Sequence, residues 1–162
     1  MSSHDFGKTL DPTISSNRTD IYFAGAAVNR RIRDGRYIDL ELEGGAGYQF
    51  ADGSANDSGQ IWGAIFARYD QFPWNRFLHT TVAISTGLNY SFKKTAYEEA
   101  EDNDDGTSKL LHYLAPELTV ALPDHQDWEA VFRLHHRSGV FGLFGCDSCG
   151  SNVVTLGVRK KL

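Results

Sequence analysis

Residues 78–92 read LHTTVAISTGLNYSF, and their side chains alternate between two kinds. The even-numbered positions are largely apolar, as at Val82 and Ile84, whereas the odd-numbered positions are small or polar, as at Ser85 and Asn89. Successive side chains of a β-strand point to opposite faces of the sheet. A period of two sustained over this length therefore predicts one long strand with an apolar face and a polar face.

The same alternation recurs elsewhere in the chain. In residues 37–50, Leu40 and Leu42 lie on one face and Glu41 and Glu43 on the other. The further segments with strand-like composition are residues 20–30, 61–72, 110–122, 128–137 and 152–162. Each segment is long enough for the roughly 9–11 residues with which a strand crosses a bilayer obliquely. The sequence therefore predicts seven strands, and no long helical pattern interrupts them.

We predict an all-β protein, an eight-stranded antiparallel transmembrane β-barrel formed by a single domain over residues 1–162. Backbone groups in lipid must all be paired, so the sheet has to close, and bacterial barrels of this kind have an even number of strands. The missing strand is placed in residues 4–10, which are short and poorly patterned. Pro116 lies within a predicted strand and lacks a ladder hydrogen bond, so a bulge is expected there.

The predicted connections alternate in character. Short turns at residues 32–36, 73–76 and 123–127 alternate with longer polar connections at residues 51–60, 93–108 and 142–151. Outer-membrane barrels have short periplasmic turns and long external loops, which puts both termini in the periplasm. The aromatic residues expected at the membrane interfaces are Trp62, Trp74, Trp128, Tyr48 and Tyr90. The alternative is a soluble, lipocalin-like barrel with its apolar faces inward.

Composition limits the classes of partner. The chain has 162 residues, a net charge of −5 at pH 7 and no basic stripe, so nucleic acid is not expected as a partner. No run of about 18 apolar residues exists, so no transmembrane helix is predicted. The first residues, MSSHD, lack the apolar core of a signal peptide. For a protein of the bacterial outer membrane, we therefore expect this sequence to be a mature or recombinant form.

Two local features have ordinary explanations that compete with functional ones. Residues 98–105 carry six acidic side chains, which predict a solvated external loop, with a divalent-cation site as the alternative. Cys146 and Cys149 form a single Cys-x-x-Cys pair in the last long connection. Without further ligands this pair is weak evidence for zinc, and a local disulfide or two incidental thiols are favoured.

The chemically informative stretch is residues 134–139, LHHRSG. His136 and Ser138 are two residues apart on a predicted strand and share a face with the apolar side chains that precede them. Asn152, which begins the last strand, has the parity that puts it on the same face. These residues can serve as base, nucleophile and orienting group on the barrel exterior. The competing explanation is that the strand leaves the bilayer at His136 and simply becomes polar.

The pattern His136-Arg137-Ser138 on the penultimate strand, with an outward polar residue opening the last strand, resembles the lipid A 3-O-deacylases of the PagL type. The resemblance covers mainly residues 128–162. It implies an eight-stranded outer-membrane barrel whose site faces the outer leaflet and removes the 3-linked hydroxyacyl chain of lipid A. It also implies that no metal or other cofactor is needed. Ser138 matches the nucleophile of that family, His136 the general base, and Asn152 its acidic residue.

The chain departs from this family at three positions. Asn152 stands at the family's acidic position, Gly139 stands where asparagine is common, and Leu162 stands where outer-membrane barrels usually end in an aromatic residue. An amide can accept the imidazole N–H but cannot stabilise an imidazolium as a carboxylate does. The alternative is therefore a non-catalytic outer-membrane barrel that binds lipopolysaccharide or has a structural role. The sequence leaves open whether the barrel forms a homodimer.

Overall fold

The computed structural model describes residues 21–51, 57–93, 109–139 and 150–161. These residues form an all-β protein with eight strands, as predicted. The strands are β1 (Ile21–Arg33), β2 (Asp39–Ala51), β3 (Ser58–Tyr69), β4 (His79–Ser91), β5 (Leu110–Leu114), β6 (Glu117–Ala121), β7 (Trp128–Ser138) and β8 (Gly150–Lys160). The strand predicted in residues 4–10 lies outside the described residues.

The described residues give eight strands for a different reason from the one predicted. The single strand expected over residues 110–122 is divided into two halves, β5 and β6. Both halves pair with β4 on one side and with β7 on the other. The break falls at Ala115 and Pro116. The register is the same on both sides of it, with Tyr113 opposite Gly87 and Glu117 opposite Ala83. No residue is inserted, so the bulge predicted at Pro116 is wrong.

Neighbouring hydrogen bonds hold the interrupted strand in place. The Ser85 hydroxyl accepts the Ala115 N–H at 2.8 Å, and the Ala115 carbonyl accepts the Ser85 N–H at 3.3 Å. On the other side, the Leu134 N–H donates to the Pro116 carbonyl at 3.0 Å. The proline is therefore accommodated by side-chain and carbonyl pairing at an unchanged register.

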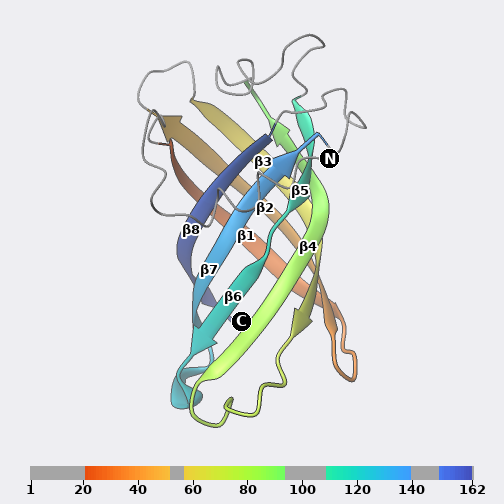
Figure 1. Cartoon of the computed structure of the whole chain (residues 1–162), viewed down its shortest axis with the longest axis vertical. Coiled ribbons are helices and arrows are strands. Elements are labelled where there is room, and N and C mark those ends of the chain that lie inside the picture. Colours follow the sequence, from red (N-terminus) through yellow and green to blue (C-terminus); the bar gives the residue numbers. More distant parts are fainter. Residues whose placement is uncertain (1–20, 52–56, 94–108, 140–149, 162) are drawn as a thin grey trace, which may run out of the picture.

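The sheet curls into a barrel (Figure 1). Each strand is antiparallel to the next one along the sheet, from β1 through β4 and the β5/β6 position to β7 and β8. The last strand, β8, also contacts β1 and runs in the same direction as β1. We call the end at which β2, β4 and β7 finish the upper end, and the opposite end the lower end.

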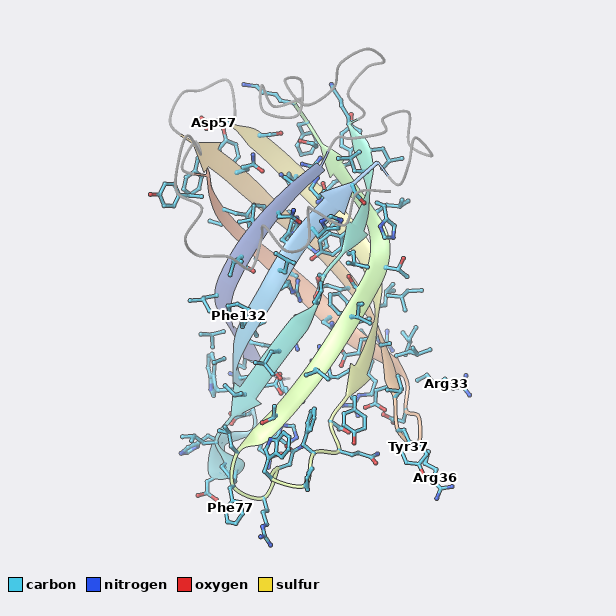
Figure 2. The ribbon with its side chains drawn as sticks, viewed as in Figure 1. Arg33, Arg36, Tyr37, Asp57, Phe77 and Phe132 are labelled. Atoms are coloured by element: carbon cyan, nitrogen blue, oxygen red, sulfur yellow. The ribbon has the colours of Figure 1, made fainter. Side chains whose placement is uncertain are left out.

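The apolar faces of the strands point outward. Ile84, Phe132 and Leu156 are 52%, 48% and 81% exposed, whereas Glu43 and Glu117 are 2% and 4% exposed. Figure 2 shows the side chains that surround the ribbon, with Phe132 labelled on β7. The inward apolar faces of the lipocalin-like alternative are therefore wrong.

The barrel interior contains paired charges, as expected for a narrow lumen filled by side chains. Glu117 accepts hydrogen bonds from three guanidinium groups, including those of Arg68 and Arg159 at 2.7 Å each. The third is Arg133, which also bridges to both carboxylate oxygens of Glu43 at 2.7 Å. All charges of this cluster except Arg159, which is partly exposed, are buried.

Trp62 belongs to this interior and not to the membrane interface, so its predicted position is wrong. It is 7% exposed, and its indole N–H donates to Glu43 at 2.9 Å. Trp62 faces inward because of its parity, since β3 buries its even-numbered residues, among them Ala64 and Phe66. The other four aromatic residues predicted at the interfaces are exposed, namely Trp74, Trp128, Tyr48 and Tyr90.

The connections follow the predicted alternation only in part. The two longest, residues 92–109 and 139–149, both join strands whose ends meet at the upper end. The third upper connection, residues 52–57, is no longer than the lower one at residues 122–127, because β2 and β3 extend further than predicted. That lower connection contains a short 3-10 helix, Pro123–His125. Among the residues that the structure describes, no helix is long and apolar enough to cross a membrane.

Candidate active site

The three predicted site residues lie on adjacent strands at the upper end of the barrel. His136 and Ser138 are the last two outward-facing residues of β7, and Asn152 is the first outward-facing residue after the start of β8. In the β7–β8 ladder, His136 is directly opposite Asn152. Side chains directly opposite each other on one face have Cβ atoms about 4.5–5.5 Å apart. The ladder therefore brings the imidazole and the amide into reach.

His136 and Asn152 form a direct hydrogen bond. The Nδ1–H of His136 donates to Oδ1 of Asn152 at 2.5 Å. In the neutral ring this bond selects the tautomer with the proton on Nδ1 and the lone pair on Nε2. This tautomer of His136 is the one whose Nε2 can accept a proton from a hydroxyl group.

Ser138 completes the predicted set by position but not by hydrogen bonding. It lies two residues beyond His136 on the same outward face and is half-buried. Within the described part of the chain, the Ser138 hydroxyl forms no hydrogen bond, with His136 or with any other group. The structure therefore joins two of the three predicted residues and brings the third beside them.

Two further polar residues face outward beside this site, and sequence analysis missed both. His112 of β5 is directly opposite Ser138 in the β5–β7 ladder. Its Nε2 lies 2.9 Å from the hydroxyl oxygen of Thr86 on β4. The available signal was parity, since His112 has the same parity as Leu110 and Leu114 on the predicted apolar face. A polar residue in that series marks an exception to the pattern.

The side chains around these polar residues are apolar. Leu88 lies directly across from His112, and Leu114 lies directly across from His136. Leu88 is 47% exposed, and Val154, the next outward residue of β8 after Asn152, is 54% exposed. We call Thr86, His112, His136, Ser138 and Asn152 the outer polar patch. The patch is a polar island on an apolar outer surface.

The inward-facing residues of β7 anchor the segment that carries the patch. His135 is buried, and its ring packs against Phe23 and Tyr113 with centroid distances of 4.7 Å each. Trp62 meets the same imidazole edge-on at 5.1 Å. Arg137, next to Ser138, is fully buried. Because residues 135 and 137 are packed in the interior, His136 and Ser138 are held on the outer surface by the alternation of the strand.

The acidic run at residues 98–105 and the pair Cys146 and Cys149 lie outside the described residues. Their predicted roles stay predictions.

Comparisons with protein-family models, with curated proteins and with solved structures found no match for this chain. Function is therefore inferred from the geometry of the outer polar patch and from the sequence resemblance.

Proposed function

We propose that this protein is an outer-membrane esterase that removes a 3-O-linked hydroxyacyl chain from lipid A. Ser138 is the nucleophile, His136 is the general base and Asn152 orients the imidazole. The partner is lipid A within lipopolysaccharide, and no cofactor takes part. The substrate comes from the sequence resemblance, whereas the chemistry comes from the outer polar patch.

One observation carries the proposal, the hydrogen bond from His136 Nδ1–H to Asn152 Oδ1 on the outward face. A polar pair on an apolar outer surface is costly in lipid, which makes a functional role the default explanation. The pair leaves Nε2 free on the ring that precedes Ser138 by two residues. A base oriented by a third group and adjacent to a hydroxyl is the arrangement used in nucleophilic ester hydrolysis.

The outer surface supports membrane insertion. Exposed aromatic residues gather near the two ends of the strands, as in the interfacial girdles of transmembrane barrels. Those near the upper end are Tyr22, Tyr48, Phe50, Tyr90 and Phe92, and those near the lower end are Tyr37, Trp74, Phe77 and Trp128. Figure 2 labels Tyr37 and Phe77 at one end of the barrel and Asp57 at the other.

Cations accompany the aromatic residues at the lower end. The Arg76 guanidinium lies 4.4 Å from the Phe77 ring centroid, and Lys160 lies 5.5 Å from that of Trp128. Such pairs suit the headgroup region, where amphipathic rings and cations meet lipid phosphates. With the lower end in the periplasm, the outer polar patch faces the outer leaflet, where lipid A is found.

The reaction then follows from the roles of the three residues. Ser138 Oγ bonds to the ester carbonyl carbon while its proton passes to His136 Nε2. The tetrahedral intermediate expels the sugar alkoxide, which takes up that proton. A water molecule, deprotonated by the same nitrogen, then attacks the carbonyl carbon of the acyl–Ser138 ester. The bond to Ser138 Oγ breaks, Oγ takes the proton back from His136 Nε2, and the hydroxy fatty acid is released.

Mass spectrometry of lipid A tests the proposal. Detergent-refolded protein is incubated with lipid A, and the variants His136→Ala and His125→Ala are treated in parallel. His125 is an exposed histidine in the lower 3-10 helix, so its removal is a matched control. We expect loss of one hydroxyacyl chain with the wild type and the His125 variant only. Unchanged lipid A from folded wild-type protein would contradict the proposal.

A second candidate is a non-catalytic barrel that binds lipopolysaccharide. It is favoured by the Ser138 hydroxyl, which makes no hydrogen bond to His136 within the described residues, and by the amide in place of a carboxylate at Asn152. This candidate predicts that the folded protein retains lipopolysaccharide in detergent while every ester of lipid A stays intact.

A further inference from the structure

His112 has a defined place beside the proposed nucleophile. It faces outward, is half-buried and lies directly opposite Ser138 across the β5–β7 ladder. Opposed side chains of such a pair have Cβ atoms about 4.5–5.5 Å apart, so an imidazole of β5 reaches the space above the serine. Ser138 is therefore flanked by two histidines, His136 along its own strand and His112 across from it.

The partners of the two histidines differ in a way that suits different tasks. His136 donates Nδ1–H to Asn152, so in the neutral ring Nε2 is the accepting nitrogen, which is the form of a base. His112 makes its hydrogen bond through Nε2, to the hydroxyl of Thr86 at 2.9 Å. When the Thr86 hydroxyl donates to Nε2, the proton of the neutral ring is on Nδ1, and this N–H is free to donate. Neutral imidazole is an established electrophilic group in enzyme sites.

An ester hydrolase also needs donors for the oxygen that becomes negative in the tetrahedral intermediate. Among the residues that the structure describes, the outer polar patch has one further polar pair besides the His136–Asn152 pair, and that pair is Thr86–His112. Leu88 and Leu114 surround it with apolar side chains. A hydrogen-bond donor in such surroundings stabilises a developing charge more strongly than it would in water.

We propose that His112 is the oxyanion donor of this site and that Thr86 sets its tautomer, a role that rests on the proposed function. When Ser138 Oγ bonds to the carbonyl carbon, its proton moves to His136 Nε2. The π electron pair of the carbonyl moves onto the carbonyl oxygen, which accepts the hydrogen bond from His112 Nδ1–H. His112 keeps its proton throughout. The pair returns when the alkoxide leaves, and the same contact serves the hydrolysis of the acyl–serine ester.

The test uses a long-chain p-nitrophenyl alkylphosphonate, which forms a stable tetrahedral adduct on an activated serine. Folded wild-type protein in detergent is treated with this probe, and the rate of adduct formation on Ser138 is measured by mass spectrometry. The variants are His112→Ala, His112→Gln and Thr86→Val, with His125→Ala as the matched control. Electrophoretic mobility without heating verifies that each variant is folded.

We expect His112→Ala to slow adduct formation about 100- to 1,000-fold, the usual effect of removing one oxyanion donor. His112→Gln keeps an N–H donor and should recover part of this loss. Thr86→Val keeps the shape of the side chain but removes the hydroxyl, so it should slow the reaction less than His112→Ala does. His125→Ala should react at the wild-type rate. In a nitrogen-15-edited proton NMR spectrum, the Nδ1 proton of His112 should lie further downfield in the wild-type adduct than in the unreacted protein.

The possible failures are distinguishable. If the wild type is labelled and folded His112→Ala is labelled at the same rate, the oxyanion role is wrong while the proposed nucleophile stands. If folded wild-type protein is not labelled, both the nucleophile and the oxyanion role are wrong. Should His112→Ala fail to fold, the inference is judged by His112→Gln and Thr86→Val, and wild-type rates for both would overturn it.

Discussion

At the scale of single residues, the site depends on an amide where a triad ordinarily has a carboxylate. Asn152 accepts the Nδ1–H of His136 and so fixes the tautomer of the ring. In the proposed reaction, it carries no charge to stabilise the imidazolium that would form when Ser138 gives up its proton. The geometry of the base is therefore preserved while part of its electrostatic support is missing.

This difference predicts a gain of activity in Asn152→Asp. A carboxylate in the same position accepts the same N–H and also stabilises the imidazolium, so we expect deacylation to rise about tenfold or more. Asn152→Leu, which removes the acceptor, should abolish activity. Time courses of fatty-acid release from lipid A measure both effects. An Asn152→Asp rate equal to or below that of the wild type would contradict the role given to Asn152.

The sequence predicted which residues share this face, but not how they pair. Parity was sufficient to place His136, Ser138 and Asn152 on the outer surface. The missing bond between Ser138 and His136 depends on side-chain rotamers, which the pattern does not determine. The sequence does not single out His112, because it lies among leucines of the same parity. Its relevance depends on the β5–β7 register, which places it opposite Ser138.

At the scale of secondary-structure elements, the interrupted strand between β4 and β7 depends on Ser85. Its hydroxyl accepts the Ala115 N–H in the barrel interior, next to the position where Pro116 has no N–H to offer. The sequence predicts a bulge because the residue that compensates for the proline, Ser85, lies on another strand, 30 residues before Ala115. The proline alone did not reveal that the register would be kept.

Replacing Ser85 tests this element. Ser85→Ala leaves the Ala115 N–H buried without its acceptor, so we expect the free energy of unfolding to fall by about 1–3 kcal/mol. Ser138→Ala is the matched control, since within the described residues that hydroxyl forms no hydrogen bond, and its effect should stay within about 0.5 kcal/mol. Urea unfolding from lipid vesicles measures both. Equal stability of the two variants would contradict the role of Ser85.

At the scale of the whole molecule, the interior ion cluster determines which face of the sheet is inside. The alternating pattern alone allowed a barrel with either face inward. The outcome follows from the charges, because Glu117 meets Arg68, Arg133 and Arg159 in one connected network across the lumen. The sequence predicted that these inward charges pair. Their exact partners required the curvature of the closed sheet.

The cluster predicts that removing a buried charge lowers the free energy of unfolding far more than removing an exposed one. Glu117→Gln leaves buried guanidinium groups without their shared carboxylate, so we expect a loss of about 3–5 kcal/mol in stability. The control is Asp34→Asn, which breaks an exposed pair with Arg31 in which the two side chains are 78% and 51% exposed. It should cost at most about 1 kcal/mol. Equilibrium unfolding from vesicles compares the two, and similar losses would contradict the importance of the cluster.

The most direct measurement is the mass of lipid A after incubation with folded wild-type protein and with the Ser138→Ala variant. The proposed reaction predicts that the wild type removes one hydroxyacyl chain and releases it as the free hydroxy fatty acid. It also predicts that Ser138→Ala, folded to the same extent, leaves lipid A unchanged. Lipid A that keeps all its chains with the wild type, or loses one with both proteins, would contradict a serine esterase at this site.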